Sequence, residues 1–148
     1  MTQLNTNDKP QDFSNEIQAL QIHLGLDNED LRVIEEHDNS YKFGEEEYLI
    51  LTDDEAEKKC NEYIWDTLWA FKPEFLANYM PLEVEHIKKI QELCEDANPI
   101  LLKLVDNKGG LERDAKASDG RGHFLSGYDG HEEEVKVNDN YYYIFRTN

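Results

Sequence analysis

Positive charge is scarce in this sequence. The 148 residues include 15 Lys and Arg against 33 Asp and Glu, which gives a net charge of −18 and a pI near 4.5. Proteins that bind nucleic acid or an anionic membrane surface directly do so through a basic patch. The composition therefore argues against both of these classes.

Cysteine and long apolar runs are scarce as well. Cys60 and Cys94 are the only cysteines and stand 34 positions apart, which favours a reducing cytosol over a disulfide scaffold. No apolar run approaches the roughly 20 residues that span a bilayer. Residues 1–10 lack the apolar stretch of a signal peptide. We therefore expect a cytoplasmic protein that does not bind membranes.

Aromatic residues, in contrast, are plentiful. Eight Tyr, six Phe and two Trp, within 39% hydrophobic residues, indicate a folded core rather than a disordered acidic tail. The length is near that of one domain. The sequence predicts a disordered leader over residues 1–13 and a single compact α+β domain over residues 14–148. This domain would hold three to four helices and two short β-hairpins.

Capping signals and hydrophobic periodicity place the first elements. We expect a helix over residues 14–25 and a second, short helix from Asp27. A hairpin over residues 40–51 follows, with its turn at Gly44. Thr52 and Glu55 match a capping box, which predicts a helix of about 18 residues that Pro73 terminates.

The second half of the chain gives weaker signals. Pro81 suits the first position of a helix, and Asn98 suits the N-cap of a short helix ending near residue 105. Residues 111–117 are consistent with one or two helical turns. A glycine-rich loop over residues 118–130 and a hairpin over residues 133–146 complete the prediction.

Acidic residues concentrate in residues 27–57. This stretch holds 13 carboxylates against Arg32 and Lys42, a net charge of −11. One interpretation is a solvated surface that keeps the protein soluble. The other is a surface that imitates the charge of duplex DNA, about one charge per 1.7 Å, and enters a basic groove. The candidates for this acidic face are Glu29, Asp30, Glu35, Glu36, Glu45, Glu46, Glu47, Asp53 and Asp54.

The glycine-rich segment carries the densest set of reactive side chains. The candidate binding residues are Asp119, Arg121, His123, Ser126, Tyr128 and Asp129. Glycine permits close backbone approach, and a guanidinium between two glycines could hold a carboxylate or a phosphate. In the alternative interpretation the segment only orders a loop, with Arg121 paired to Asp129 or Glu133.

Known catalytic and metal-binding patterns are absent from this segment. Ser126 lacks the flanking glycines of a nucleophile elbow, and the phosphate-binding loop and dinucleotide fingerprint are missing. Calcium-loop and zinc spacings are missing too. We therefore predict no catalytic residues, no metal and no cofactor.

Trp65 and Trp69 also permit two interpretations. They stand four residues apart and would share one face of the predicted long helix. Both are core residues if that helix is central. If one face is uncovered, they are candidate anchors of a protein interface, where tryptophan is enriched.

Several of these segments resemble a family of small acidic proteins carried by bacteriophages and prophages. The similar segments are LTDDEA at 51–56, DTLWAF at 66–71, AN at 97–98, DGRGHFLSGYDG at 119–130 and YYIFR at 142–146. The resemblance covers roughly residues 17–148, and the segment at 119–130 is the specific one. Lys72-Pro73 and His131 depart from the familiar pattern. The family has no established activity, so the resemblance implies provenance only: a protein acting in a bacterial cell during phage infection.

Together these features favour a protein that binds a host partner rather than an enzyme. The hypothesis is that the chain inhibits or modulates a host nucleic-acid-binding defence protein with a basic groove, by nucleic-acid mimicry. An alternative is a binding module or enzyme for a small phosphorylated ligand, held by residues 119–130. A third is a virion or packaging accessory protein whose acidity only keeps it soluble. The sequence leaves the oligomeric state open.

Overall fold

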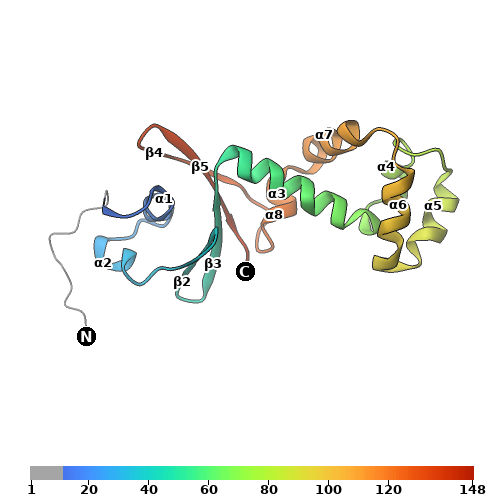
Figure 1. Ribbon diagram of the computed structural model, residues 1–148. Coiled ribbons are helices and arrows are strands. Elements are labelled where there is room, and N and C mark those ends of the chain that lie inside the picture. Colours follow the sequence, from blue (N-terminus) through green and yellow to red (C-terminus); the bar gives the residue numbers. More distant parts are fainter. Residues whose placement is uncertain (1–11) are drawn as a thin grey trace. The chain divides into compact units, whose positions relative to one another are not determined.

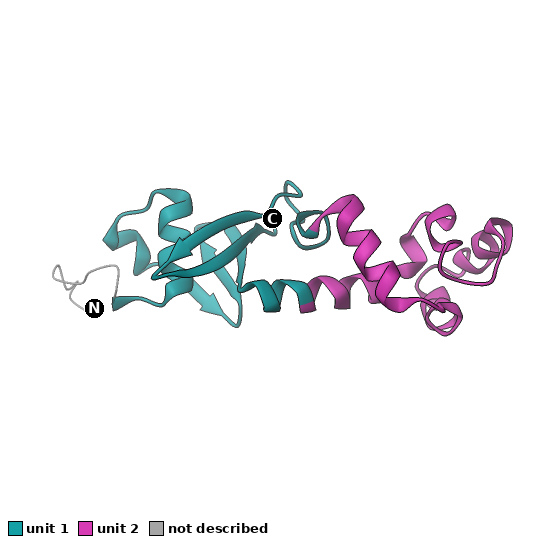
Figure 2. Cartoon of the chain, turned by 90° about the horizontal axis from the view of Figure 1, so that it is seen from above, with its two compact units in different colours: residues 1–57, 121–148 teal, residues 58–120 magenta. Residues whose placement is uncertain are grey.

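The computed structural model describes residues 12–148, which form helices and one antiparallel sheet (Figure 1). This confirms the α+β class. The chain divides into two compact units, unit 1 up to residue 57 together with 121–148, and unit 2 over residues 58–120 (Figure 2). Residues 1–11 of the predicted leader lie outside the described residues, and the single domain over 14–148 stays a prediction.

Unit 1 is built on a five-stranded sheet. Its strands are β1 (Glu35–His37), β2 (Ser40–Phe43), β3 (Glu46–Leu51), β4 (Glu133–Val137) and β5 (Asn140–Arg146), in the order β1-β2-β3-β5-β4, all antiparallel. The two predicted hairpins are part of one sheet, but β1 and β2 form a further hairpin, so the predicted count of two is wrong. β1 escaped prediction because its sequence, Glu-Glu-His, has no β-prone apolar residue.

The core of unit 1 lies between the sheet and α1 (Asn15–Leu24). Ser14 caps this helix by accepting from the Ile17 N–H, and Gly25 ends it in the left-handed conformation, as predicted. α1 packs against β3, β4 and β5. Strand alternation turns one set of side chains toward it: Tyr41, Tyr48, Ile50, Val135, Val137, Tyr142 and Ile144, all buried with Ala19 and Leu20.

Short helices complete unit 1. α2 (Asn28–Leu31) begins with a capping box in which Asp27 and Asp30 exchange hydrogen bonds. α8 (Arg121–Leu125) lies where the sequence indicated a loop and buries Phe124 and Leu125. Residues 12–148 hold eight α-helices, several of one turn, so the predicted count of three to four is wrong.

α3 (Asp53–Asp66) starts at the predicted capping box but ends earlier than expected. It has 14 residues and is followed by the 3₁₀ helix η2 (Leu68–Ala70). The Asn98 side chain donates to the Trp65 carbonyl and accepts from the Trp69 N–H, at 2.6 and 3.1 Å. These bonds satisfy backbone groups that a longer helix would use, so a distant residue sets the end of α3.

Unit 2 holds the remaining helices. α4 (Pro73–Leu76) begins at Pro73, so this proline starts a helix instead of closing the previous one. α5 (Val84–Gln91) begins three residues after Pro81, not at it, with Glu83 at its N-cap. The 3₁₀ helix η3 (Cys94–Ala97) runs into α6 (Asn98–Leu104).

α7 (Lys108–Asp119) is longer than the one or two helical turns predicted over residues 111–117. Its 12 residues run through Gly109 and Gly110, where glycine propensity favoured a break. Asn107 caps the helix by accepting from the Gly110 N–H at 3.1 Å. In the part of the chain that the structure describes, no helix is long and apolar enough to cross a membrane.

Candidate functional site

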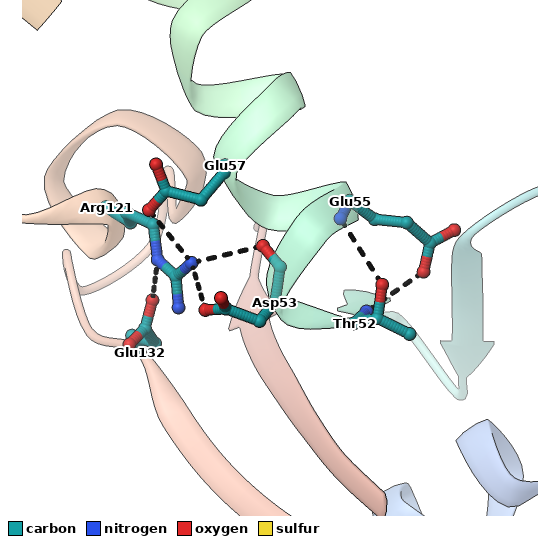
Figure 3. Close-up of polar contacts among 6 residues, drawn as sticks. All are labelled: Thr52, Asp53, Glu55, Glu57, Arg121 and Glu132. Atoms are coloured by element: carbon teal, nitrogen blue, oxygen red, sulfur yellow. Dashed lines mark hydrogen bonds and ion pairs between the residues drawn. The ribbon is translucent and has the colours of Figure 1, made fainter.

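Arg121 is the centre of a charged cluster in unit 1 (Figure 3). Its Nη1 lies 2.8 Å from Asp53 Oδ1 and 3.2 Å from Glu57 Oε1, and its Nε lies 2.7 Å from Glu132 Oε1. The guanidinium carbon lies 4.7 Å from the centre of the Tyr143 ring. We call Arg121, these three carboxylates and Tyr143 the Arg121 clasp.

Local sequence positions each member of the clasp. The Thr52 hydroxyl accepts from the Glu55 N–H at 3.3 Å, and Glu55 accepts from the Thr52 N–H at 2.9 Å. This box starts α3 at Asp53, and the i,i+4 spacing brings Glu57 to the same face of the helix. Arg121 is the first residue of α8.

The clasp holds one cation among three anions. The Arg121 side chain is only 11% exposed. Burial alone would lower its pKa, but the hydrogen bonds and charges of Glu132 and Asp53 outweigh this and raise the pKa above its ordinary value. The pKa of Tyr143 is raised as well, here by burial itself, and the charges of Glu134 and Asp53 add to that effect.

Arg121 does not pair with the carboxylates that the sequence predicted for it. The sequence pointed to Asp129 or Glu133, but the ion pairs go to Asp53, Glu57 and Glu132. Three carboxylates also surround the guanidinium that the phosphate hypothesis requires. The site therefore does not favour binding of a phosphorylated ligand through Arg121.

The rest of the glycine-rich segment folds into a tight turn beside β5. The buried Ser126 hydroxyl lies 2.9 Å from Asp129 Oδ1 and 2.6 Å from the Arg146 carbonyl oxygen. The His131 N–H donates to Asp129 at 3.0 Å. That bond is the main cause that lowers the pKa of Asp129, and Ser126 assists against the opposing effect of burial.

A second guanidinium closes this turn. The Arg146 guanidinium carbon stacks 3.5 Å from the centre of the Tyr128 ring, and its Nη1 lies 3.5 Å from Glu46 Oε1. Tyr128 itself stays 56% exposed. Arg146 thus joins the turn to the start of β3.

The six predicted loop residues do not form one site. Ser126, Tyr128 and Asp129 meet in the turn, while Arg121 belongs to the clasp. His123 is exposed and packs edge-on against Phe124. Asp119 is the last residue of α7 and belongs to unit 2. Within residues 12–148 no group of three or more His, Cys, Asp or Glu side chains could hold a metal ion.

Negative charge is concentrated in unit 1. Its described residues include 20 acidic and five basic side chains, a net of −15, whereas unit 2 has 12 acidic and nine basic ones, a net of −3. The acidic-face residues are Glu29 and Asp30 in α2, Glu35 and Glu36 in β1, Glu45 in the turn before β3, Glu46 and Glu47 in β3, and Asp53 and Asp54 in α3.

The strands distribute these carboxylates over both faces of the sheet. Glu35, Lys42 and Glu47 stand opposite one another across β1, β2 and β3. Glu36 and Glu46 lie on the other face, where they accept hydrogen bonds from the hydroxyls of Tyr41 and Tyr48. Burial is the main cause that raises the pKa of both tyrosines. The charge of Glu16 and then that of Glu36 add to it at Tyr41, and the bond to Glu46 adds to it at Tyr48. The exposed members of the acidic face are Glu29, Glu35, Glu36, Glu45, Asp53 and Asp54.

The two tryptophans do not share a helix face, because Trp69 lies in η2 beyond the end of α3. Both are half-buried in unit 2. Trp65 Nε1 donates to Glu112 of α7 at 2.5 Å. Their role as interface anchors stays a prediction.

Sequence reasoning missed four residues that organise the site: Glu57, Glu132, Tyr143 and Arg146. Of these, only Glu57 had a usable signal in the sequence: it stands four residues after Asp53, just behind a capping box, which places both carboxylates on one face of a helix. Comparison with protein-family models, with curated proteins and with solved structures finds no match to this chain.

Proposed function

We propose that this chain is a phage-derived acidic protein that binds a basic groove of a host nucleic-acid-binding protein, such as a defence effector, and inhibits or modulates it. The observation that carries the proposal is the uneven charge: unit 1 has a net charge of −15 and unit 2 of −3. The resemblance of residues 119–130 to small phage proteins supports the bacterial setting.

Exposure supports the role of unit 1 in this binding. Glu29, Glu35, Glu45 and Asp54 lie at the surface on α2, β1, the turn between β2 and β3, and α3. A field of one sign steers an oppositely charged partner and raises the rate of encounter. The Arg121 guanidinium is only 11% exposed and is paired with three carboxylates, so this cluster keeps a net negative charge near the start of α3.

The test is affinity capture from a nuclease-treated bacterial lysate with three baits and stepped salt elution. The first bait is the wild-type chain. The second carries E29Q, E35Q, E45Q and D54N in unit 1, and the third carries E62Q, E74Q, E92Q and E95Q in unit 2. All eight side chains are exposed, and both variants raise the net charge by four.

The proposal predicts one basic protein captured by the wild type and by the unit 2 variant, released at moderate salt and displaced by added duplex DNA. The unit 1 variant does not capture this protein, because the four substitutions remove the charges whose attraction salt screens in the wild type. Equal capture by both variants, or a complex that DNA and high salt leave intact, would contradict the proposal.

A further inference from the structure

Unit 1 is discontinuous along the chain. The backbone leaves it after Glu57, within α3, and returns at Arg121, so that the 63 residues of unit 2 are inserted between these two points. Figure 2 shows the change of unit along α3. Bringing together the two chain ends of a long insertion costs loop-closure entropy, which contacts across the break must offset.

The Arg121 clasp holds these two ends. The first residue after the break bonds to the last turn before it, through Asp53 Oδ1 at 2.8 Å, the Asp53 carbonyl at 3.3 Å and Glu57 Oε1 at 3.2 Å. On its other side, Arg121 bonds to Glu132, which lies on the returning segment. The clasp therefore has one link across the break and one link that does not cross it.

Close packing fixes the returning end further. A Cβ on Gly122 would lie 2.8 Å from the His131 carbonyl carbon and 2.9 Å from the Gly130 carbonyl carbon, and it would also contact the Gly130 oxygen. Arg121 stacks on Tyr143 of β5. The start of α8 is thus fixed to the rest of unit 1 both by the ion pairs of Arg121 and by the close backbone approach at Gly122.

We propose that the Arg121 clasp is a conformational device that closes unit 1 at the point of insertion, so that unit 2 and unit 1 open independently. The link across the break, from Arg121 to Asp53 and Glu57, performs this closure. When unit 2 opens, its chain becomes a flexible loop. β3 stays paired with β5, and the clasp keeps the loop from pulling the first turn of α3 away from α8. The proposal does not depend on the binding function.

Native-state hydrogen exchange of the full chain at increasing urea tests this proposal. Peptides from β3 and β5 report on unit 1, and peptides from α6 and α7 report on unit 2. The test variant, D53N with E57Q, removes both charges of the link across the break. The matched control, E132Q, removes the charge of the link that does not cross it. The three carboxylates are 64%, 43% and 30% exposed, so these variants keep the core intact.

The wild type and E132Q are expected to show two separate urea dependences, one for each unit. In D53N with E57Q the two dependences move toward each other, because the difference in protection between the units falls about tenfold, the effect of losing one hydrogen bond to a charged group. The proposal is overturned if the double variant keeps the wild-type difference, if E132Q reduces it equally, or if the wild-type units open at one urea concentration.

Discussion

At the scale of single residues, Gly122 has the strictest requirement in the segment over residues 119–130. Any Cβ there would meet the backbone of Gly130 and His131, which cannot move aside as a flexible side chain can. Gly120 and Gly130 adopt positive φ angles of 82° and 72°, a separate reason for glycine. The glycines that suggested a ligand loop are therefore explained by packing and backbone conformation.

The substitution Gly122→Ala is expected to destabilise the protein by about 1–2 kcal/mol. Overpacking typically costs about 1–3 kcal/mol, and the better helix propensity of alanine offsets about 0.5–1 kcal/mol of this. The matched control is Gly109→Ala, also in a helix, where the new methyl group meets nothing within 4 Å. Urea unfolding followed by circular dichroism measures both. If G122A is as stable as G109A, the close approach at Gly122 is not a constraint.

Arg121 shows why its environment could not be predicted from local sequence. Its partners Asp53 and Glu57 lie 68 and 64 positions away along the chain. The sequence offered Asp129 and Glu133 because they are nearby, and nothing in the residue pattern favours distant carboxylates over these. Only the topology, which returns the chain to the start of α3, makes that choice.

At the scale of elements, the starts of helices were predictable and several of their ends were not. The caps at Ser14, Asp27 and Thr52 depend on residues three or four positions apart, so their signals are complete within a short window. The end of α3 depends on Asn98, more than 30 positions away from Trp65. Tertiary bonds of this kind override local propensity.

A hydrogen bond between Tyr79, shortly after α4, and Asp114 of α7 gives unit 2 a testable pH dependence. The phenol donates to Asp114 Oδ2. Burial and then this bond raise the pKa of Tyr79 to about 12. In the same pair, the bond from Tyr79 is the main cause that lowers the pKa of Asp114.

Because the pKa of Tyr79 is higher in the folded state, the protonated phenol stabilises unit 2. Its contribution is fully present below pH 10, the ordinary tyrosine value, and is lost as the pH rises from about 10 to about 12. The difference in phenolate absorbance between the wild type and Tyr79→Phe isolates this titration from the other seven tyrosines. Asp114→Asn should lower the midpoint only in part, since burial remains. A midpoint near pH 10 in the wild type would contradict this interpretation.

At the scale of the whole molecule, the acidity has two consequences that oppose each other. Both edge strands carry adjacent glutamates, Glu35 and Glu36 in β1 and Glu133 and Glu134 in β4, which discourages edge-to-edge pairing with other chains. The same charges repel one another within unit 1. Which consequence dominates stability depends on how much of the charge the clasp and similar ion pairs compensate.

Salt distinguishes repulsion from attraction in unit 1. The Debye length falls from about 30 Å at 0.01 M salt to about 10 Å at 0.1 M, so added salt weakens repulsion between exposed carboxylates. The Arg121 clasp is screened much less, because its guanidinium is 11% exposed. Unit 1 has a net charge of −15 and unit 2 of −3. The stabilisation that salt brings by weakening repulsion should therefore exceed the stabilisation it removes by weakening ion pairs mainly in unit 1.

We therefore expect salt over this range to raise the urea resistance of unit 1 more than that of unit 2, measured by exchange of β3 and α6 amides. The variant with E29Q, E35Q, E45Q and D54N should show a smaller salt effect in unit 1, since four of the repelling charges are gone. The unit 2 variant should behave like the wild type there. If salt instead weakens unit 1, its surface ion pairs contribute more than the repulsion, and the acidic face is a balanced network rather than a field of one sign.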